Sequence, residues 1–167
     1  GSKPLYMLDY YATHSLHEKF NGVNRCENFL QNLVATCKRY NVGLIGGELA
    51  EVPALYDENK YDLAGFGVGI VDKFGIIDKC NCRIGDAVIG IKSSGPHSNG
   101  YSLINALIET WGLDKNKEFI TGCLKPTKIY IDPILDLLKV QVVSGIAHIT
   151  GGGFNNISRI IPNNLAV

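Results

Sequence analysis

The sequence has no surplus of charge and no long apolar run. Sixteen Lys and Arg residues balance 16 Asp and Glu residues, so the formal net charge is zero. Because phosphate backbones are bound mainly through clustered Lys and Arg, we do not expect nucleic acid as a partner. No run of 18 apolar residues occurs and no signal peptide precedes the first apolar segment. These absences argue against a membrane protein and predict a cytoplasmic one.

Paired cysteines are also missing. The five cysteines are an odd number and contain no Cys-x-x-Cys motif. Cys80 and Cys82 are separated by one residue, and no histidine nearby completes a zinc-binding pattern. We therefore expect free, reduced thiols, as in cytoplasmic proteins.

The length suits a folded protein, but both ends predict a fragment. A chain of 167 residues can bury roughly 70% of the surface that its unfolded form exposes. It begins with Gly1-Ser2 rather than with methionine, and its single methionine, Met7, lies within an apolar run. It ends at Leu165-Ala166-Val167, in a sequence typical of the start of a strand.

Apolar spacing predicts alternating strands and helices, the pattern of a mixed α/β protein. The expected strands are Leu5 to Tyr11, Val42 to Ile45, Tyr61 to Val71, Ala87 to Ile91 and Val142 to Ala147. The expected helices are Arg25 to Tyr40, Tyr101 to Thr110, Tyr130 to Leu138 and the short Phe154 to Ile160. A change of character near Asp72 to Gly75 predicts a domain boundary.

Glycine is the unusual component: 19 of 167 residues, about 11% against a usual share of about 7%. The segment Gly46-Gly47-Glu48-Leu49-Ala50-Glu51 reads as a tight turn after a strand. Glycines allow a ligand to approach the backbone, and two carboxylates beyond a strand end can hold a divalent cation. Since Mg²⁺ prefers one or two carboxylates plus phosphate oxygens, a magnesium-nucleotide site is one interpretation. A solvated turn with both carboxylates in water is the other.

Two further glycine turns each precede a helix. The first, from Ser93 to Gly100, gathers hydroxyl, amide and imidazole groups at a helix start, which favours an anion such as phosphate or carboxylate. Ordinary N-capping by Ser98 or Asn99 is the alternative. The second, Thr150-Gly151-Gly152-Gly153, has the strand, turn and helix order of a phosphate cradle but lacks the lysine of a P-loop.

Gly65, Gly67 and Gly69 alternate within one expected strand and therefore share a face. This spacing indicates close approach of another backbone or subunit, or else a loosely packed strand.

Five segments together resemble the phosphoribosylformylglycinamidine cyclo-ligase family, also called aminoimidazole ribonucleotide synthetases. They are Pro4 to Thr13, Gly46 to Pro53, Tyr61 to Phe66, Ser93 to Leu103 and His148 to Phe154. The fourth is the most specific. Formylglycinamidine synthetase and the selenophosphate and thiamine-phosphate kinase-like group share the glycine-acid turn but not this segment.

The resemblance implies a synthetase of two α/β domains, both truncated in this chain. Residues 1–73 would be the C-terminal part of an ATP-binding and dimerisation domain, and residues 74–167 the N-terminal part of a substrate-cleft domain. The implied reaction uses ATP and Mg²⁺ to close formylglycinamidine ribonucleotide to aminoimidazole ribonucleotide in purine biosynthesis, releasing ADP and phosphate. The implied assembly is a homodimer, which binds the small-molecule substrate and ATP.

The resemblance also implies roles for individual residues. Gly46, Gly47, Glu48 and Glu51 would bind magnesium-ATP, with Glu48 as the metal ligand. Ser94, Gly95, His97, Ser98 and Asn99 would line the substrate side of the cleft, and Gly151, Gly152 and Gly153 would meet a phosphate group. His97, Asp9 and His148 remain alternative catalytic bases.

Three departures from the family pattern leave alternatives open. Leu49 stands where the family usually has threonine, and the segment from Phe154 to Arg159 is one residue shorter, with Ser158 in place of proline. The family also extends beyond both ends of this chain. A non-catalytic, self-associating fragment or a kinase-like relative therefore remains an alternative to an active cyclo-ligase.

Overall fold

A computed structural model describes residues 1–140 and 142–166. The chain forms two compact units, Gly1–Ile76 and Ile77–Val167, and each is described by itself. None of the helices in the described residues is long and apolar enough to cross a membrane.

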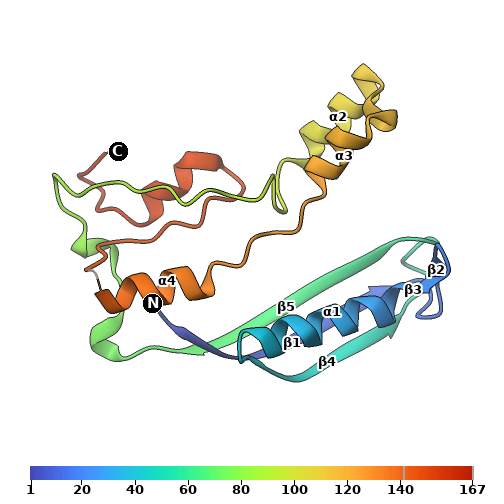
Figure 1. Cartoon of the computed structure of the whole chain (residues 1–167), viewed down its shortest axis with the longest axis horizontal. Coiled ribbons are helices and arrows are strands. Elements are labelled where there is room, and N and C mark those ends of the chain that lie inside the picture. The colour runs from blue at the N-terminus through green and yellow to red at the C-terminus, as the bar shows by residue number, and fades with distance from the viewer. Residues whose placement is uncertain (141, 167) are drawn as a thin grey trace. The chain divides into compact units, whose positions relative to one another are not determined.

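The first unit is a three-stranded mixed sheet with one helix packed on it (Figure 1). Its order is β4-β1-β5, with β1 parallel to β4 and antiparallel to β5. This arrangement confirms the predicted α/β class. The elements are β1 (Lys3–Thr13), β2 (Lys19–Phe20), β3 (Val23–Asn24), α1 (Arg25–Arg39), β4 (Gly43–Glu51), β5 (Tyr61–Ile70) and the 3-10 turn η1 (Lys73–Gly75).

Helix α1 follows its predicted range to within one residue. The Asn24 side chain caps its first turn by accepting a hydrogen bond from the Glu27 amide at 2.8 Å. Two basic residues in the last turn complement the negative end of the helix dipole. The helix packs on the sheet through its buried residues Cys26 and Cys37, and the Phe29 ring lies 5.5 Å from that of Tyr11 on β1.

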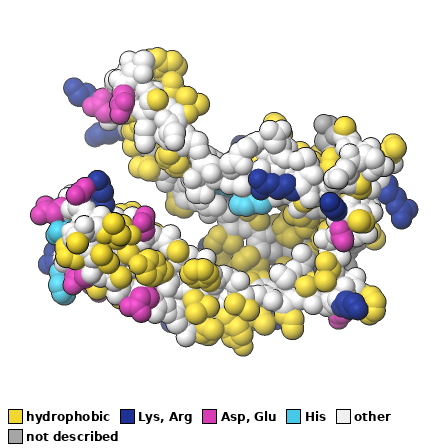
Figure 2. All heavy atoms as spheres, turned by 180° about the vertical axis from the view of Figure 1, so that it is seen from behind, with side chains coloured by type: hydrophobic (Ala, Val, Ile, Leu, Met, Phe, Trp, Pro, Cys, Tyr) yellow, Lys and Arg dark blue, Asp and Glu magenta, His cyan; other side chains and the backbone are white. Residues whose placement is uncertain are grey.

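The sheet has a helix face and an open face. Asp9, Tyr11 and Thr13 alternate on the helix face, the side that α1 covers. The residues between them point to the opposite, open face, together with their partners on the neighbouring strands. On that face Tyr6, Phe66 and Val68 are 45–61% exposed, and apolar side chains gather there when the molecule is seen from behind (Figure 2).

The predicted turn at Gly46 to Glu51 is wrong, because these residues form the second half of β4. They pair in register with Leu8 to Thr13 of β1. The pairing shifts just before this stretch: Met7 lies opposite Leu44 but Leu8 lies opposite Gly46, so Ile45 is one extra residue, a β-bulge. The glycines continue the strand because hydrogen bonds to β1 hold them, a partner that local sequence does not reveal.

The glycine series on β5 is explained partly within the chain. Gly65 and Gly67 lie opposite Asp9 and Met7, on the helix face. A Cβ at Gly65 would lie 2.7 Å from Met7 Cε, and one at Gly69 would lie 2.9 Å from the Lys3 carbonyl oxygen. Close approach of another backbone is therefore confirmed at Gly69, whereas Gly65 lies against a flexible side chain and Gly67 has open space. The large exposed apolar residues of β5 alternate with these glycines on the other face.

The second unit is helical in its described residues, with long extended connections (Figure 1). The predicted helices at Tyr101 to Thr110 and Tyr130 to Leu138 are confirmed as α2 and α4, within two residues at each end. The elements are η2 (Lys79–Asn81), α2 (Tyr101–Trp111), η3 (Leu113–Lys115), α3 (Lys117–Cys123), α4 (Ile131–Val140) and η4 (Gly153–Arg159). The sequence did not predict helix α3 or the two short paired strands β2 and β3.

Two strand predictions for this unit are wrong. Ala87 to Ile91 and Val142 to Ala147 form no strand, since neither pairs with a neighbour within residues 1–140 and 142–166. Val88 and Ile89 are accordingly 67% and 82% exposed. A strand is stable only as part of a ladder, so β-branched composition is insufficient here. The short helix expected at Phe154 to Ile160 is confirmed as η4, which is a 3-10 helix that begins at the left-handed Gly153.

Candidate functional site

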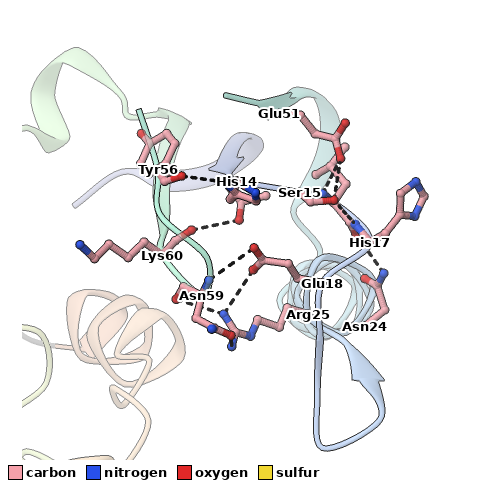
Figure 3. Close-up of polar contacts among 12 residues, drawn as sticks. His14, Ser15, His17, Glu18, Asn24, Arg25, Glu51, Tyr56, Asn59 and Lys60 are labelled. Carbon is pink, nitrogen blue, oxygen red and sulfur yellow. Dashed lines mark hydrogen bonds and ion pairs between the residues drawn. The ribbon is translucent and has the colours of Figure 1, made fainter. Parts of the chain in front are cut away.

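Glu51 at the end of β4 fastens the loop that follows β1 (Figure 3). Its Oε1 atom accepts a hydrogen bond from the Leu16 amide at 2.7 Å and one from Ser15 Oγ at 3.1 Å. These hydrogen bonds, the backbone one foremost, lower the pKa of the Glu51 carboxyl. Glu51 is therefore ionised at neutral pH and already engaged in holding its own fold.

Glu48 lies on the other side of the sheet from Glu51. Glu48 pairs with Tyr10 and Glu51 with Thr13, and residues three apart in a strand point to opposite faces. The interpretation in which both carboxylates hold one cation is therefore wrong. No group of three acidic, histidine or cysteine side chains suited to a metal occurs among the described residues. Any Mg²⁺ here would rely on Glu48, which is exposed, with phosphate oxygens completing its coordination.

Asp9 is buried on the helix face, only 8% exposed. Burial raises the pKa of the Cys26 and Cys37 thiols, and the Asp9 carboxylate nearby raises it further. Gly47 lies directly opposite Asp9, and a Cβ at Gly47 would overlap the Asp9 carboxyl. The absent side chain of Gly47 thus makes room for Asp9, which lies beneath α1 and not at an exposed edge.

A polar cluster near the end of β1 went unnoticed in the sequence (Figure 3). Arg25 donates hydrogen bonds to the side chain and carbonyl oxygens of Asn59 at 2.6 and 3.1 Å, and pairs with Glu18 at 3.6 Å. Thr13 Oγ1 donates to the Lys60 carbonyl at 3.0 Å. These contacts tie the 14–18 and 52–60 loops together. The hydrogen bonds to Asn59 and Lys60 span 34 to 47 residues and leave no local signal.

In the second unit, Ser94 connects its loop to a distant segment. Its hydroxyl donates to the Pro126 carbonyl at 2.7 Å and accepts from the Lys128 amide at 3.0 Å. Both functions of the hydroxyl are thus used within the fold. Its main effect in this structure is to fix the start of the loop that carries Gly95 and His97.

His97 is held in an unusual backbone conformation with a defined tautomer. Its φ is 60°, the left-handed region that histidine rarely adopts. Its Nε2 atom accepts a hydrogen bond from the Ser94 amide at 3.3 Å, which leaves the proton of the neutral ring on Nδ1. The Tyr101 hydroxyl donates to the His97 carbonyl at 3.1 Å and fixes the residue to α2.

The N-capping alternative for Ser98 and Asn99 is wrong. The N-cap of α2 is Gly100, with φ 86°, and no side chain caps this helix. Asn99 instead donates a hydrogen bond from Nδ2 to Thr150 Oγ1, 51 residues away. A Cβ at Gly151 would lie 3.1 Å from Asn99 Oδ1. The structure therefore brings two of the three predicted glycine segments together.

The Thr150–Gly153 turn presents backbone donors beside Asn99. Gly152 and Gly153 have φ of 98° and 58°, and the Gly153 amide donates back to the Thr150 carbonyl at 3.0 Å. Within the described part of the chain, the Gly151 and Gly152 amides have no hydrogen-bond acceptor. Free amides of consecutive residues in a glycine turn suit an anion. His148, just before this turn, is exposed.

Two family models match the chain along almost its whole length. The AIR synthase related protein N-terminal domain matches residues 1–71, and the C-terminal domain of the same family matches residues 83–166. The chain belongs to the AIR synthase related family. The predicted resemblance is confirmed, and the Asn99–Thr150 junction lies within the C-terminal AIR synthase related domain.

Three curated relatives of this AIR synthase related chain share one name. It is 46% identical over 169 residues to phosphoribosylformylglycinamidine cyclo-ligases of two Coxiella burnetii strains, covering 98% of this chain and 47% of each relative. It is 44% identical over 172 residues to the Syntrophus aciditrophicus protein of that name, covering 98% and 48%. The chain thus spans about half the length of the curated relatives that it matches.

Proposed function

We propose that the full-length protein containing this chain is a cytoplasmic phosphoribosylformylglycinamidine cyclo-ligase. It closes the ring of formylglycinamidine ribonucleotide in purine biosynthesis, with ATP converted to ADP and phosphate and with Mg²⁺ as the cofactor that accompanies the nucleotide. The observation that carries the proposal is the junction of the 93–100 loop with the Thr150–Gly153 turn through Asn99. It joins the most specific matching segment to the glycine turn, and the names of the relatives are consistent with it.

The candidate site residues have different proposed roles, which follow from the chemistry of each side chain or backbone group. Bound magnesium-ATP supplies the phosphoryl group that makes an amide-type oxygen a good leaving group. Glu48, exposed on its strand, is the proposed magnesium ligand beside Gly46 and Gly47 in the ATP-binding domain. The free Gly151 and Gly152 amides bind the phosphate of the substrate, and Asn99 orients it. His97 holds a proton on Nδ1, where it can be exchanged with the substrate.

Phosphate release from ATP tests this function. In the full-length protein, release should require formylglycinamidine ribonucleotide and should cease when that substrate is omitted. The alternative kinase-like activity would instead release ADP with a small alcohol or phosphate acceptor. Turnover with such an acceptor and none with formylglycinamidine ribonucleotide would contradict the proposal.

The alternative of a non-catalytic fragment concerns the 167-residue chain itself. A calorimetric titration of this chain with magnesium-ATP separates the two hypotheses. Saturable binding would show that the chain retains a nucleotide site, and a Glu48→Gln variant should weaken it. Absence of heat with an active full-length protein would assign the chain a folding or dimerising role only.

The proposed homodimer forms through the open face of the sheet. Tyr6, Phe66 and Val68 on this face are 45–61% exposed, and Ile70, which follows on β5, is 61% exposed. Adjacent exposed apolar residues of this kind mark an interaction surface. The glycines that first suggested an interface lie on the helix face, so the dimer is assigned to their neighbours.

Phe66→Glu should weaken this dimer at least tenfold, because a carboxylate would be buried without a partner. Phe74→Glu is the matched control, since Phe74 is 96% exposed and lies outside the sheet. Sedimentation equilibrium of both variants measures the association constant. Equal association of the two variants would remove the open face from the dimer.

A further inference from the structure

We propose that Asn156 is a positioning residue that sets the shape of the phosphate-binding turn. The inference rests on the proposed function, because it assigns Asn156 to the substrate side of that site. Asn156 is 4% exposed, and it is one of only three polar or charged residues that are buried within the described residues. A buried amide in so small a core is costly unless its hydrogen bonds are satisfied.

Both ends of the Asn156 amide are used on one short stretch of backbone. Its Oδ1 atom accepts from the Thr150 amide at 2.7 Å, and its Nδ2 atom donates to the Gly151 carbonyl at 3.1 Å. The side chain thus holds the first two residues of the turn from within. A Cβ at Gly152 would lie 3.3 Å from Asn156 Nδ2, so the next residue of the turn packs on the same amide.

The turn needs this support because its own sequence is flexible. Three successive glycines have the largest conformational freedom of any tripeptide, and two of them adopt positive φ. Only the hydrogen bond from the Gly153 amide to the Thr150 carbonyl closes the turn through its own backbone. Asn156 adds two further constraints, on the Thr150 amide and the Gly151 carbonyl, and neither uses the Gly151 or Gly152 amide.

Through Thr150, Asn156 also affects Asn99 and the 93–100 loop, which form the other half of the proposed site. It fixes the Thr150 backbone, and the hydroxyl of the same residue accepts the hydrogen bond from Asn99. Asn156 therefore influences substrate through Thr150 and Gly151 without needing to touch it. The neighbouring Asn155 is exposed and its side chain makes no hydrogen bond within residues 1–140 and 142–166, so it offers a matched control of the same residue type.

Steady-state kinetics of the full-length protein test the inference. Asn156→Ala should raise the KM for formylglycinamidine ribonucleotide at least tenfold while the KM for ATP changes less than twofold, and Asn155→Ala should change neither. Asn156→Asp retains the volume and the acceptor for Thr150 but replaces the donor to Gly151 with negative charge near the bound phosphate. It should raise the KM for formylglycinamidine ribonucleotide further, and it serves if the alanine variant does not fold.

The combined effect of Asn99 and Asn156 substitutions on KM distinguishes a positioning role of Asn156 from general destabilisation of the protein. The Asn99→Ala/Asn156→Ala double variant should raise KM by less than the product of the two single effects, because both residues act through Thr150. A lower melting temperature with unchanged KM in the Asn156 variants would overturn the inference. So would strictly multiplicative effects on KM.

Hydrogen exchange in the 167-residue chain tests the positioning separately from the reaction. The Thr150 amide should exchange at least tenfold faster in the Asn156→Ala variant than in the Asn155→Ala variant. Unchanged exchange would refute the positioning role even in an active enzyme. Faster exchange in a protein that does not close the ring would support the positioning role while the proposed function fails.

Discussion

Gly47→Ala should lower the free energy of unfolding of the first unit by about 3 kcal/mol. The added methyl group would overlap the carboxyl of Asp9 and lie 2.7 Å from its carbonyl oxygen. Asp9 is buried beneath α1, so its side chain has little room to move away. Relief therefore requires β1 and β4 to separate, or α1 to lift from the sheet. Chemical denaturation monitored by circular dichroism measures the loss.

Gly46→Ala is the matched control for this prediction. A Cβ at Gly46 would meet only Leu8 Cδ2, at an ordinary contact distance of 3.9 Å. Because alanine loses less backbone entropy than glycine, this variant should be neutral or more stable by about 0.5 kcal/mol. If the two residues formed a solvated turn, both substitutions would have similar effects. Equal stabilities would thus contradict the strand and its register.

His97→Ala in the full-length protein should lower kcat for ring closure by about 100-fold or more, the usual range for loss of a general acid or base. The melting temperature should change little, because the His97 side chain makes one hydrogen bond within the described residues, to the Ser94 amide. His97→Asn keeps a residue that tolerates positive φ and separates loss of the ring from loss of loop conformation.

His148→Ala decides between the two histidines. His148 is exposed and lies just before the glycine turn, so its removal should leave stability unchanged. A large loss of kcat in this variant with an unaffected His97→Ala variant would transfer the proton-exchange role to His148. Asp9→Asn is less informative. The Asp9 side chain is buried near the thiols of Cys26 and Cys37 on α1, so its substitution also alters folding.

Local sequence patterns correctly predicted the elements that are stabilised by contacts between residues close together in the sequence. The spacing of Cys26, Phe29 and Cys37 placed α1 correctly, because a helix satisfies its own hydrogen bonds. The interpretation of Gly46-Gly47 as a turn failed because the partner strand lies almost 40 residues earlier. The prediction of a strand at Ala87 to Ile91 failed for the opposite reason. The composition of this segment suits a strand, but no described strand pairs with it.

The candidate site was predicted in its segments but not in its connections. The specific motif from Ser93 to Gly100 contains Asn99, yet nothing local indicated that Asn99 reaches Thr150. Ser94 was assigned to substrate, whereas its hydroxyl is occupied by Pro126 and Lys128. Asn156 was overlooked because one asparagine of an Asn-Asn pair is indistinguishable from the other until burial is known.

The β-bulge at Ile45 in β4 determines which of Glu48 and Glu51 lies on the helix face of the sheet and which on the open face. Before the bulge Leu44 lies opposite Met7, and after it Gly46 lies opposite Leu8, so Ile45 inverts the alternation of every following residue. If Ile45 paired with Leu8 instead of forming the bulge, Glu48 would point beneath α1 and Glu51 would point to the open face. Gly47 would then no longer lie opposite Asp9, and the Glu51 contacts with Ser15 and Leu16 would be lost. The bulge thus determines which of the two acids is available to a ligand and which one secures the fold.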